Sequence, residues 1–203
     1  GAGAGFYSGL FGRLLFLTRA VECFPEKADR VESYAEKCFE LICSQPQIHT
    51  YCNGMAGILE CLKYIAHRGR FDIDYSEIEA SYRLLFLRKM QQDFACGGDY
   101  DLLHGAMGVA YHFRADDTFA TEAVRWLRRT AVSDDGKLKW ASVLPPADRG
   151  VRGYNICLSH GISGVLLVLC ALARHHPDNR DITKLIDGAA RYILSQEYDD
   201  PDI

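Results

Sequence analysis

The sequence lacks long apolar runs. None of its 203 residues belongs to a stretch of eighteen consecutive apolar residues, the length that suggests a membrane-spanning helix. No basic segment leads into an apolar core at the start, as a secretory signal would require. We therefore expect no transmembrane segment and a cytoplasmic location.

The sequence also lacks an excess of positive charge. It carries 23 Lys and Arg against 27 Asp and Glu, a formal net charge of −4, and the two signs are interleaved. Binding to nucleic acid depends on clustered basic residues that neutralise phosphates. We therefore expect no nucleic-acid partner.

A Cys-x-x-Cys pair, the usual mark of a zinc site, does not occur among the eight cysteines. Two weaker pairs remain, His49-x-x-Cys52 and Cys157-x-x-His160, and each supplies only two ligands. Other cysteines, such as Cys38, stand among apolar residues, where a reduced thiol behaves as a small hydrophobic group. This segment alone is expected to bind no metal.

Alternating strand patterns are absent at any length that competes with helical periodicity. Apolar residues recur every three or four positions in several stretches, which predicts an all-α fold. Ser76 with Glu79 forms a candidate capping box, and Asn179 or Asp181 is a candidate helix cap. The predicted helices are 31–42, 55–65, 78–90, 119–130 and 182–194.

A polar-Gly-x-x-Gly motif occurs four times, each time before an apolar stretch. The intervals between the motifs accommodate two helices each, which predicts four helical-pair repeats. A glycine inside a helix costs about 1 kcal/mol relative to alanine, so the motif needs a compensating reason. We expect neighbouring backbones to approach closely there. The repeat glycines are Gly9, Gly12, Gly54, Gly57, Gly105, Gly108, Gly161 and Gly164.

One polar residue precedes the first glycine of each motif: Ser8, Asn53, His104 or His160. If the motif helices form an inner layer, these side chains converge at the rim of a cavity. The positive ends of the helix dipoles would gather at the same rim, where they favour developing negative charge.

Three of these motifs resemble those of the lanthionine synthetase C family, and the resemblance covers nearly the whole chain. The most specific stretch is 155–164, which is similar to the family's Asn-x-Gly-x-x-His-Gly-x-x-Gly pattern, except that Cys157 replaces the usual glycine. The resemblance implies an α/α toroid of seven helical-hairpin repeats. Residues 1–203 would form a single domain, an incomplete arc of about four repeats, with the C-terminal repeats missing.

The family resemblance also implies an activity. In a lanthipeptide cyclase, a cysteine thiolate of the precursor peptide adds to dehydroalanine or dehydrobutyrine and closes a thioether ring. Zinc, held by two cysteines and a histidine in the later repeats, is expected only in the full-length protein. By position in the motifs, His160 matches the active-site histidine and Asp101 an acidic residue of the same cavity. The implied partner is a dehydrated precursor peptide.

Two other hypotheses remain open at this point. A non-catalytic family member that lacks the zinc half would bind peptides or thiols without turnover. Other helical toroids include glycosidases, but a second acid facing Asp101 across a cleft is not identifiable. An incomplete arc would also expose an apolar flank, which predicts self-association or a partner such as a dehydratase.

Overall fold

A computed structural model describes residues 3–44, 47–68, 74–95, 100–142 and 153–197. These residues form helices and one short β-hairpin, which confirms the predicted all-α class. The helices are α1 (Leu10–Ala20), η1 (Pro25–Lys27), α2 (Ala28–Ser44), α3 (Met55–His67), α4 (Ser76–Ala95), α5 (Ala106–His112), α6 (Asp117–Thr130), α7 (Ile162–His175) and α8 (Arg180–Leu194). The predicted helices correspond to α2, α3, α4, α6 and α8.

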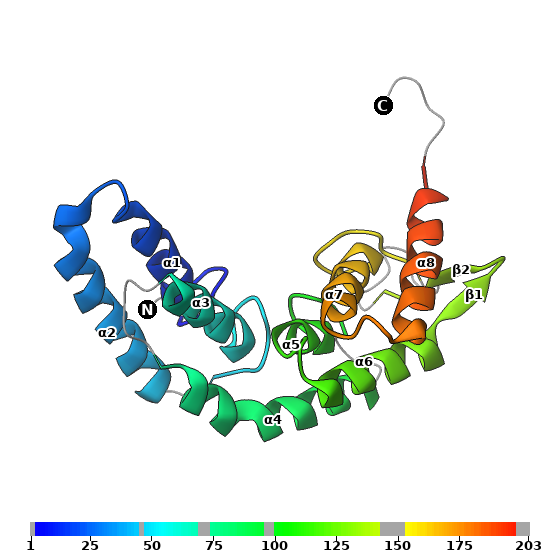
Figure 1. Ribbon diagram of the computed structural model, residues 1–203, viewed down its shortest axis with the longest axis horizontal. Coiled ribbons are helices and arrows are strands. Elements are labelled where there is room, and N and C mark those ends of the chain that lie inside the picture. The colour runs from blue at the N-terminus through cyan, green and yellow to red at the C-terminus, as the bar shows by residue number, and fades with distance from the viewer. Residues whose placement is uncertain (1–2, 45–46, 69–73, 96–99, 143–152, 198–203) are drawn as a thin grey trace. The chain divides into compact units, whose positions relative to one another are not determined.

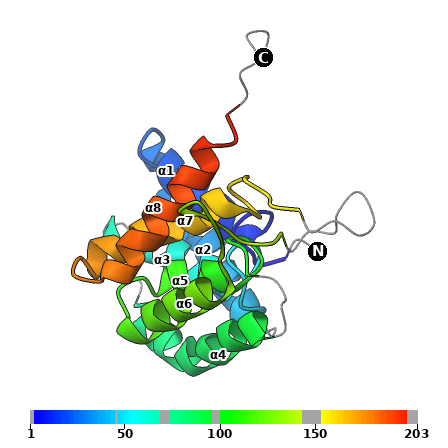
Figure 2. The same cartoon turned by 90° about the vertical axis from the view of Figure 1, so that its right-hand side faces the viewer.

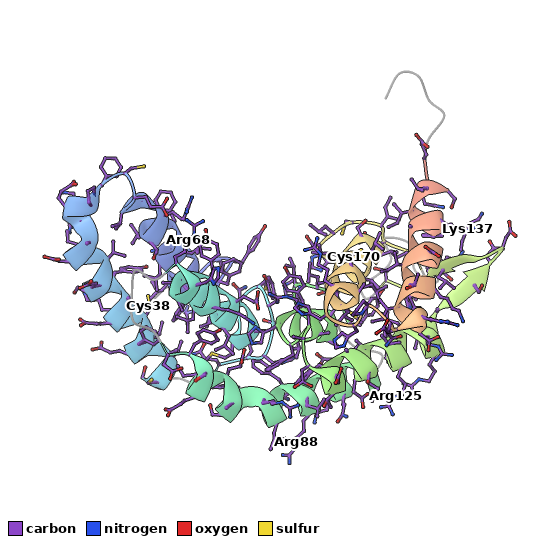
Figure 3. All side chains as sticks on the ribbon, viewed as in Figure 1. Cys38, Arg68, Arg88, Arg125, Lys137 and Cys170 are labelled. Atoms are coloured by element: carbon purple, nitrogen blue, oxygen red, sulfur yellow. The ribbon has the colours of Figure 1, made fainter. Side chains whose placement is uncertain are left out.

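The chain divides into two compact units, Gly1–Lys89 and Met90–Ile203, with the boundary inside α4. In the first unit, α1 packs against both α2 and α3 (Figure 1). The buried positions of α2 recur at helical spacing, and Cys38 among them lies on the side of the helix turned toward α1 (Figure 3). This spacing is the one that predicted the helix from sequence.

In the second unit, α7 lies between α5 and α8 and packs against both (Figure 2). Trp126 of α6 stacks on the Phe94 ring, with ring centroids 4.6 Å apart. Its indole Nε1–H donates to the Phe94 carbonyl oxygen at 2.9 Å, so the buried polar atom is satisfied. These contacts hold the last turn of α4 against α6.

A two-stranded hairpin, β1 (Val132–Asp134) and β2 (Lys137–Lys139), was not predicted. Each strand has three residues, too few for an alternating pattern to stand out. The Asp135-Gly136 dipeptide was the sequence signal for a hairpin turn. Both residues have positive φ, 47° and 73°, as such a turn requires. Leu138 lies against Gly188 of α8, where an added Cβ would come within 2.4 Å of its Cγ.

Helix capping confirms one prediction and corrects another. The Asn179 side chain accepts from the backbone N–H of Asp181 and of Ile182, so Asn179 caps α8 as expected. Ser76 instead lies inside α4, and its backbone N–H donates to the Asp74 carboxylate at 2.9 Å. The predicted capping box is therefore wrong, because the Ser76 hydroxyl donates to Asp74 and the Glu79 backbone N–H donates to the Tyr75 carbonyl oxygen.

Within the described ranges, every helix is too short or too polar to cross a bilayer. An open groove of about 790 Å³ lies in the first unit beside α1. Two of its lining side chains are largely exposed, Tyr7 at 74% and Phe16 at 71%. The apolar flank expected of an incomplete arc, and the partner that would cover it, remain predictions.

The buried thiols of the first unit should resist alkylation. Burial raises the pKa of Cys38 to about 11 and that of Cys61 to about 12, so both stay protonated at pH 8. Each pKa unit removes a factor of about 10 in thiolate, so iodoacetamide should modify both at least about 100-fold more slowly than exposed Cys157. Peptide mass spectrometry of the native and the unfolded chain measures the rates, and equal rates in the native chain would contradict the assignment.

Candidate functional site

The four motif loops share one backbone conformation. The first glycine of each motif is the extended N-cap of α1, α3, α5 or α7. In every repeat, a backbone N–H in the first turn donates to the carbonyl oxygen seven residues earlier; the donor directly follows the first glycine in three repeats and lies one residue further on in the third. The four bonds are Leu10 to Gly3 at 3.0 Å, Met55 to Ile48 at 2.7 Å, Met107 to Tyr100 at 3.0 Å and Ile162 to Asn155 at 2.8 Å. The loop thus closes on the helix that it begins.

This closure explains the second glycine of the motif. A Cβ added at Gly12, Gly57 or Gly164 would lie 2.0, 1.8 or 2.3 Å from a carbonyl oxygen of the preceding loop. Close backbone approach was predicted, but between neighbouring helices. At these three glycines the closest atom belongs instead to the loop six residues upstream, so the glycine is required by the turn itself.

The residue before the first glycine meets its counterpart in the adjacent repeat. In the first unit, the Ser8 hydroxyl donates to the Asn53 side-chain oxygen at 2.8 Å. In the second unit, the rings of His104 and His160 stack with centroids 5.0 Å apart and planes 3° apart. Within each unit, two of the four rim residues therefore lie together, and the convergence of all four at one cavity remains a prediction.

Asp101 lies next to both histidines of this pair and is 2% exposed. One carboxylate oxygen, Oδ1, accepts the backbone N–H of His104 at 2.6 Å. The other, Oδ2, lies 2.8 Å from His160 Nδ1 and 3.8 Å from His104 Nδ1. A buried carboxylate is costly unless it is hydrogen-bonded, and these contacts supply that stabilisation.

The tautomer of His160 follows from this contact. An ionised carboxylate accepts only, so Nδ1 of His160 carries the hydrogen and Nε2 is the nitrogen that Asp101 leaves unengaged. The His160 side chain is 23% exposed, whereas that of His104 is 45% exposed. The two sequence-predicted residues, Asp101 and His160, are therefore in direct contact.

Cys157 occupies the position in the fourth repeat that Asp101 occupies in the third, four residues before the first glycine. Its sulfur accepts the backbone N–H of His160 at 3.4 Å, as Asp101 accepts that of His104. Asn155 supports the same loop by accepting the Cys157 N–H at 2.8 Å. The cysteine in place of the usual glycine thus fits the loop. Its sulfur accepts the backbone N–H of His160.

Tyr100 adjoins the site through the chain. Its side chain is 3% exposed and packs on Trp126. Burial, with a further contribution from the Asp101 charge, raises the pKa of the Tyr100 phenol. The phenol therefore stays protonated around neutral pH and is not a base.

The described ranges contain one group of three potential metal ligands, Asp101, His104 and His160, whose donor atoms all lie within 4.8 Å of one another. Sequence reasoning had placed His104 only at the cavity rim. No cysteine belongs to the group, so these residues do not fit the zinc centre of two cysteines and a histidine that the family resemblance implies.

Comparison with protein families identifies the family of this chain. The model of a family described as lanthionine synthetase C-like protein matches residues 2–202. Among curated proteins, no sequence matches this chain.

Proposed function

The chain belongs to the lanthionine synthetase C-like family, and from that premise we propose that it supplies the acid–base residues of a thioether-forming cyclase. The substrate is a precursor peptide that carries dehydroalanine or dehydrobutyrine. The observation that carries the proposal is the contact between the buried Asp101 carboxylate and His160 Nδ1 at 2.8 Å.

The chemistry requires one proton at a defined carbon. When a cysteine thiolate attacks the β-carbon, a C–S bond forms and the C=C π bond breaks. The electron pair moves onto the α-carbon and its carbonyl oxygen as an enolate, which a proton at the α-carbon then quenches. The thiol's own proton leaves to solvent, so the net reaction adds S–H across the double bond.

His160 is suited to deliver that proton. Imidazole changes its protonation state near neutral pH, which makes it an efficient general acid. Asp101 holds the ring by Nδ1, so the transfer falls to Nε2. A carboxylate in this position also stabilises the imidazolium that exists before the transfer. His160 is thus the proposed catalytic residue and Asp101 the proposed positioning residue.

The N-terminus of α7 lies beside His160 and contributes a favourable dipole. His160 directly precedes Gly161, the N-cap of this 14-residue helix. The positive end of a helix dipole stabilises negative charge within about its first turn. An enolate held beside His160 would therefore form next to a favourable dipole rather than next to a second carboxylate.

The experiment is a cyclisation assay of the full-length, zinc-loaded protein with a dehydrated precursor peptide. Substituting His160→Ala should lower the rate of thioether formation roughly 100-fold or more, because the general acid is removed. Free cysteine on the peptide, counted by thiol alkylation and mass spectrometry, reports the rate. His175→Ala is the matched control, since His175 is exposed at the end of α7, and it should cyclise at the original rate.

Two outcomes would redirect the proposal. Unchanged cyclisation by His160→Ala would remove His160 from the mechanism. Saturable peptide binding by the full-length, zinc-loaded protein, with no thioether formed, would favour the alternative of a non-catalytic peptide- or thiol-binding member of the family.

A further inference from the structure

We propose that Asp101, His104 and His160 form a binding site for a divalent transition-metal ion of the Zn²⁺, Co²⁺ or Ni²⁺ class. The donors would be one carboxylate oxygen and two imidazole nitrogens. This set differs from the thiolate-rich zinc centre that the family resemblance implies, and it lies on residues of this chain alone.

The donor separations suit such an ion. Tetrahedral zinc has bonds of about 2.0–2.2 Å to nitrogen and oxygen, which places its ligand atoms about 3.3–3.5 Å apart. Asp101 Oδ2 lies 2.8 Å from one imidazole nitrogen and 3.8 Å from the other, and all three donors lie within 4.8 Å. Shifts of about 0.5–1.5 Å would bring the three to ligand spacing.

The loops fix the donors before any ion arrives. Oδ1 of Asp101 accepts the His104 backbone N–H, so Oδ2 is the oxygen that remains for the two imidazoles. His160 is fixed by Asp101 and by the capped loop that precedes α7. Only His104 is substantially exposed, at 45% of its side chain, which leaves an open side for the ion and its water ligands.

Ring orientation sets what must move on binding. A metal ion lies in the plane of each imidazole that binds it, along the nitrogen lone pair. The two rings are parallel to within 3° and stacked, so one ion cannot lie in both planes until one ring turns. His104 is the ring that is free to turn. Metal binding should therefore break the stack.

The surroundings make the ion exchangeable rather than permanent. A single carboxylate compensates its charge, and the N-terminal end of α7 opposes a cation beside His160. If the proposed function holds, an ion on His160 Nδ1 would displace the hydrogen by which Asp101 holds the ring, and that proton would leave to solvent. Metal occupancy would then act as an inhibitory control on the acid–base pair.

The test uses the 203-residue chain and metal ions alone, with no peptide substrate. Zn²⁺ binding is measured by calorimetry, and Co²⁺ binding by visible absorption. We expect one ion per chain and a Co²⁺ spectrum without the thiolate charge-transfer band that cysteine ligands produce. His104→Ala and His160→Ala should each raise the dissociation constant for the ion at least about 10-fold. The exposed His175→Ala control should bind as the original chain does.

A second variant separates the ligand from the ring stack. His104→Phe keeps an aromatic ring against His160 but offers no nitrogen, so it should lose the ion as His104→Ala does while keeping the thermal stability. Undiminished binding in both His104 variants, or a thiolate band in the Co²⁺ spectrum, would overturn the site. Because no peptide takes part, this result is independent of whether the chain cyclises anything.

Discussion

Replacing Asp101 with asparagine should lower the cyclisation rate roughly 100- to 10,000-fold with little loss of stability. The asparagine oxygen can still accept the His104 backbone N–H, so the loop before α5 keeps its cap. The amide nitrogen then faces His160 Nδ1, where the carboxylate oxygen used to accept. Two donors cannot bond each other, so the ring turns or changes tautomer, and the imidazolium loses its counter-charge.

Three controls make the Asp101→Asn result specific. The exposed Asp178→Asn variant removes an equal charge in the same unit and should keep the original rate. Because Asp101 acts through His160, the double variant with His160→Ala should be no slower than His160→Ala alone. A further loss in the double variant, or a full rate in Asp101→Asn, would show that Asp101 does not position His160. Thermal unfolding of each variant checks that the fold is retained.

The repeats made much of the site predictable. Helical spacing located the helices, and the motif register placed Ser8, Asn53, His104 and His160 at equivalent positions. The same register contains a further signal. Asp101 stands four residues before its glycine, the position from which a side chain accepts the backbone N–H three residues later, as Cys157 does in the following repeat.

Other features of the site could not be predicted from the sequence, for physical reasons. The stacking of His104 on His160 depends on how α5 packs against α7, a contact between segments far apart in the chain. The use of both Asp101 oxygens depends on a carboxylate orientation that no spacing encodes. The reason for the second glycine was also misplaced, since a motif cannot show whether a neighbouring helix or the residue's own loop comes close.

That glycine gives the largest expected effect on stability. Substituting Gly57→Ala should destabilise the chain by about 2–4 kcal/mol. The new Cβ would lie 1.8 Å from the Tyr51 carbonyl oxygen and 2.9 Å from the Phe6 Cβ, so backbone atoms must move. An unstrained Gly→Ala change inside a helix would instead stabilise by about 1 kcal/mol, so the sign of the effect tests the loop closure.

The control is Gly3→Ala, because an added Cβ there meets nothing within 4 Å. It should leave the urea midpoint nearly unchanged, whereas Gly57→Ala should lower it without changing the slope of the transition. The loop that Gly57 closes also carries Asn53, so the Ser8–Asn53 hydrogen bond should weaken together with the fold. If Gly57→Ala were as stable as the original chain, the loop could move aside, and the second glycine would not be required by closure. The same test at Gly164, where the loop carries His160, would then decide whether closure of the loop holds the imidazole in place.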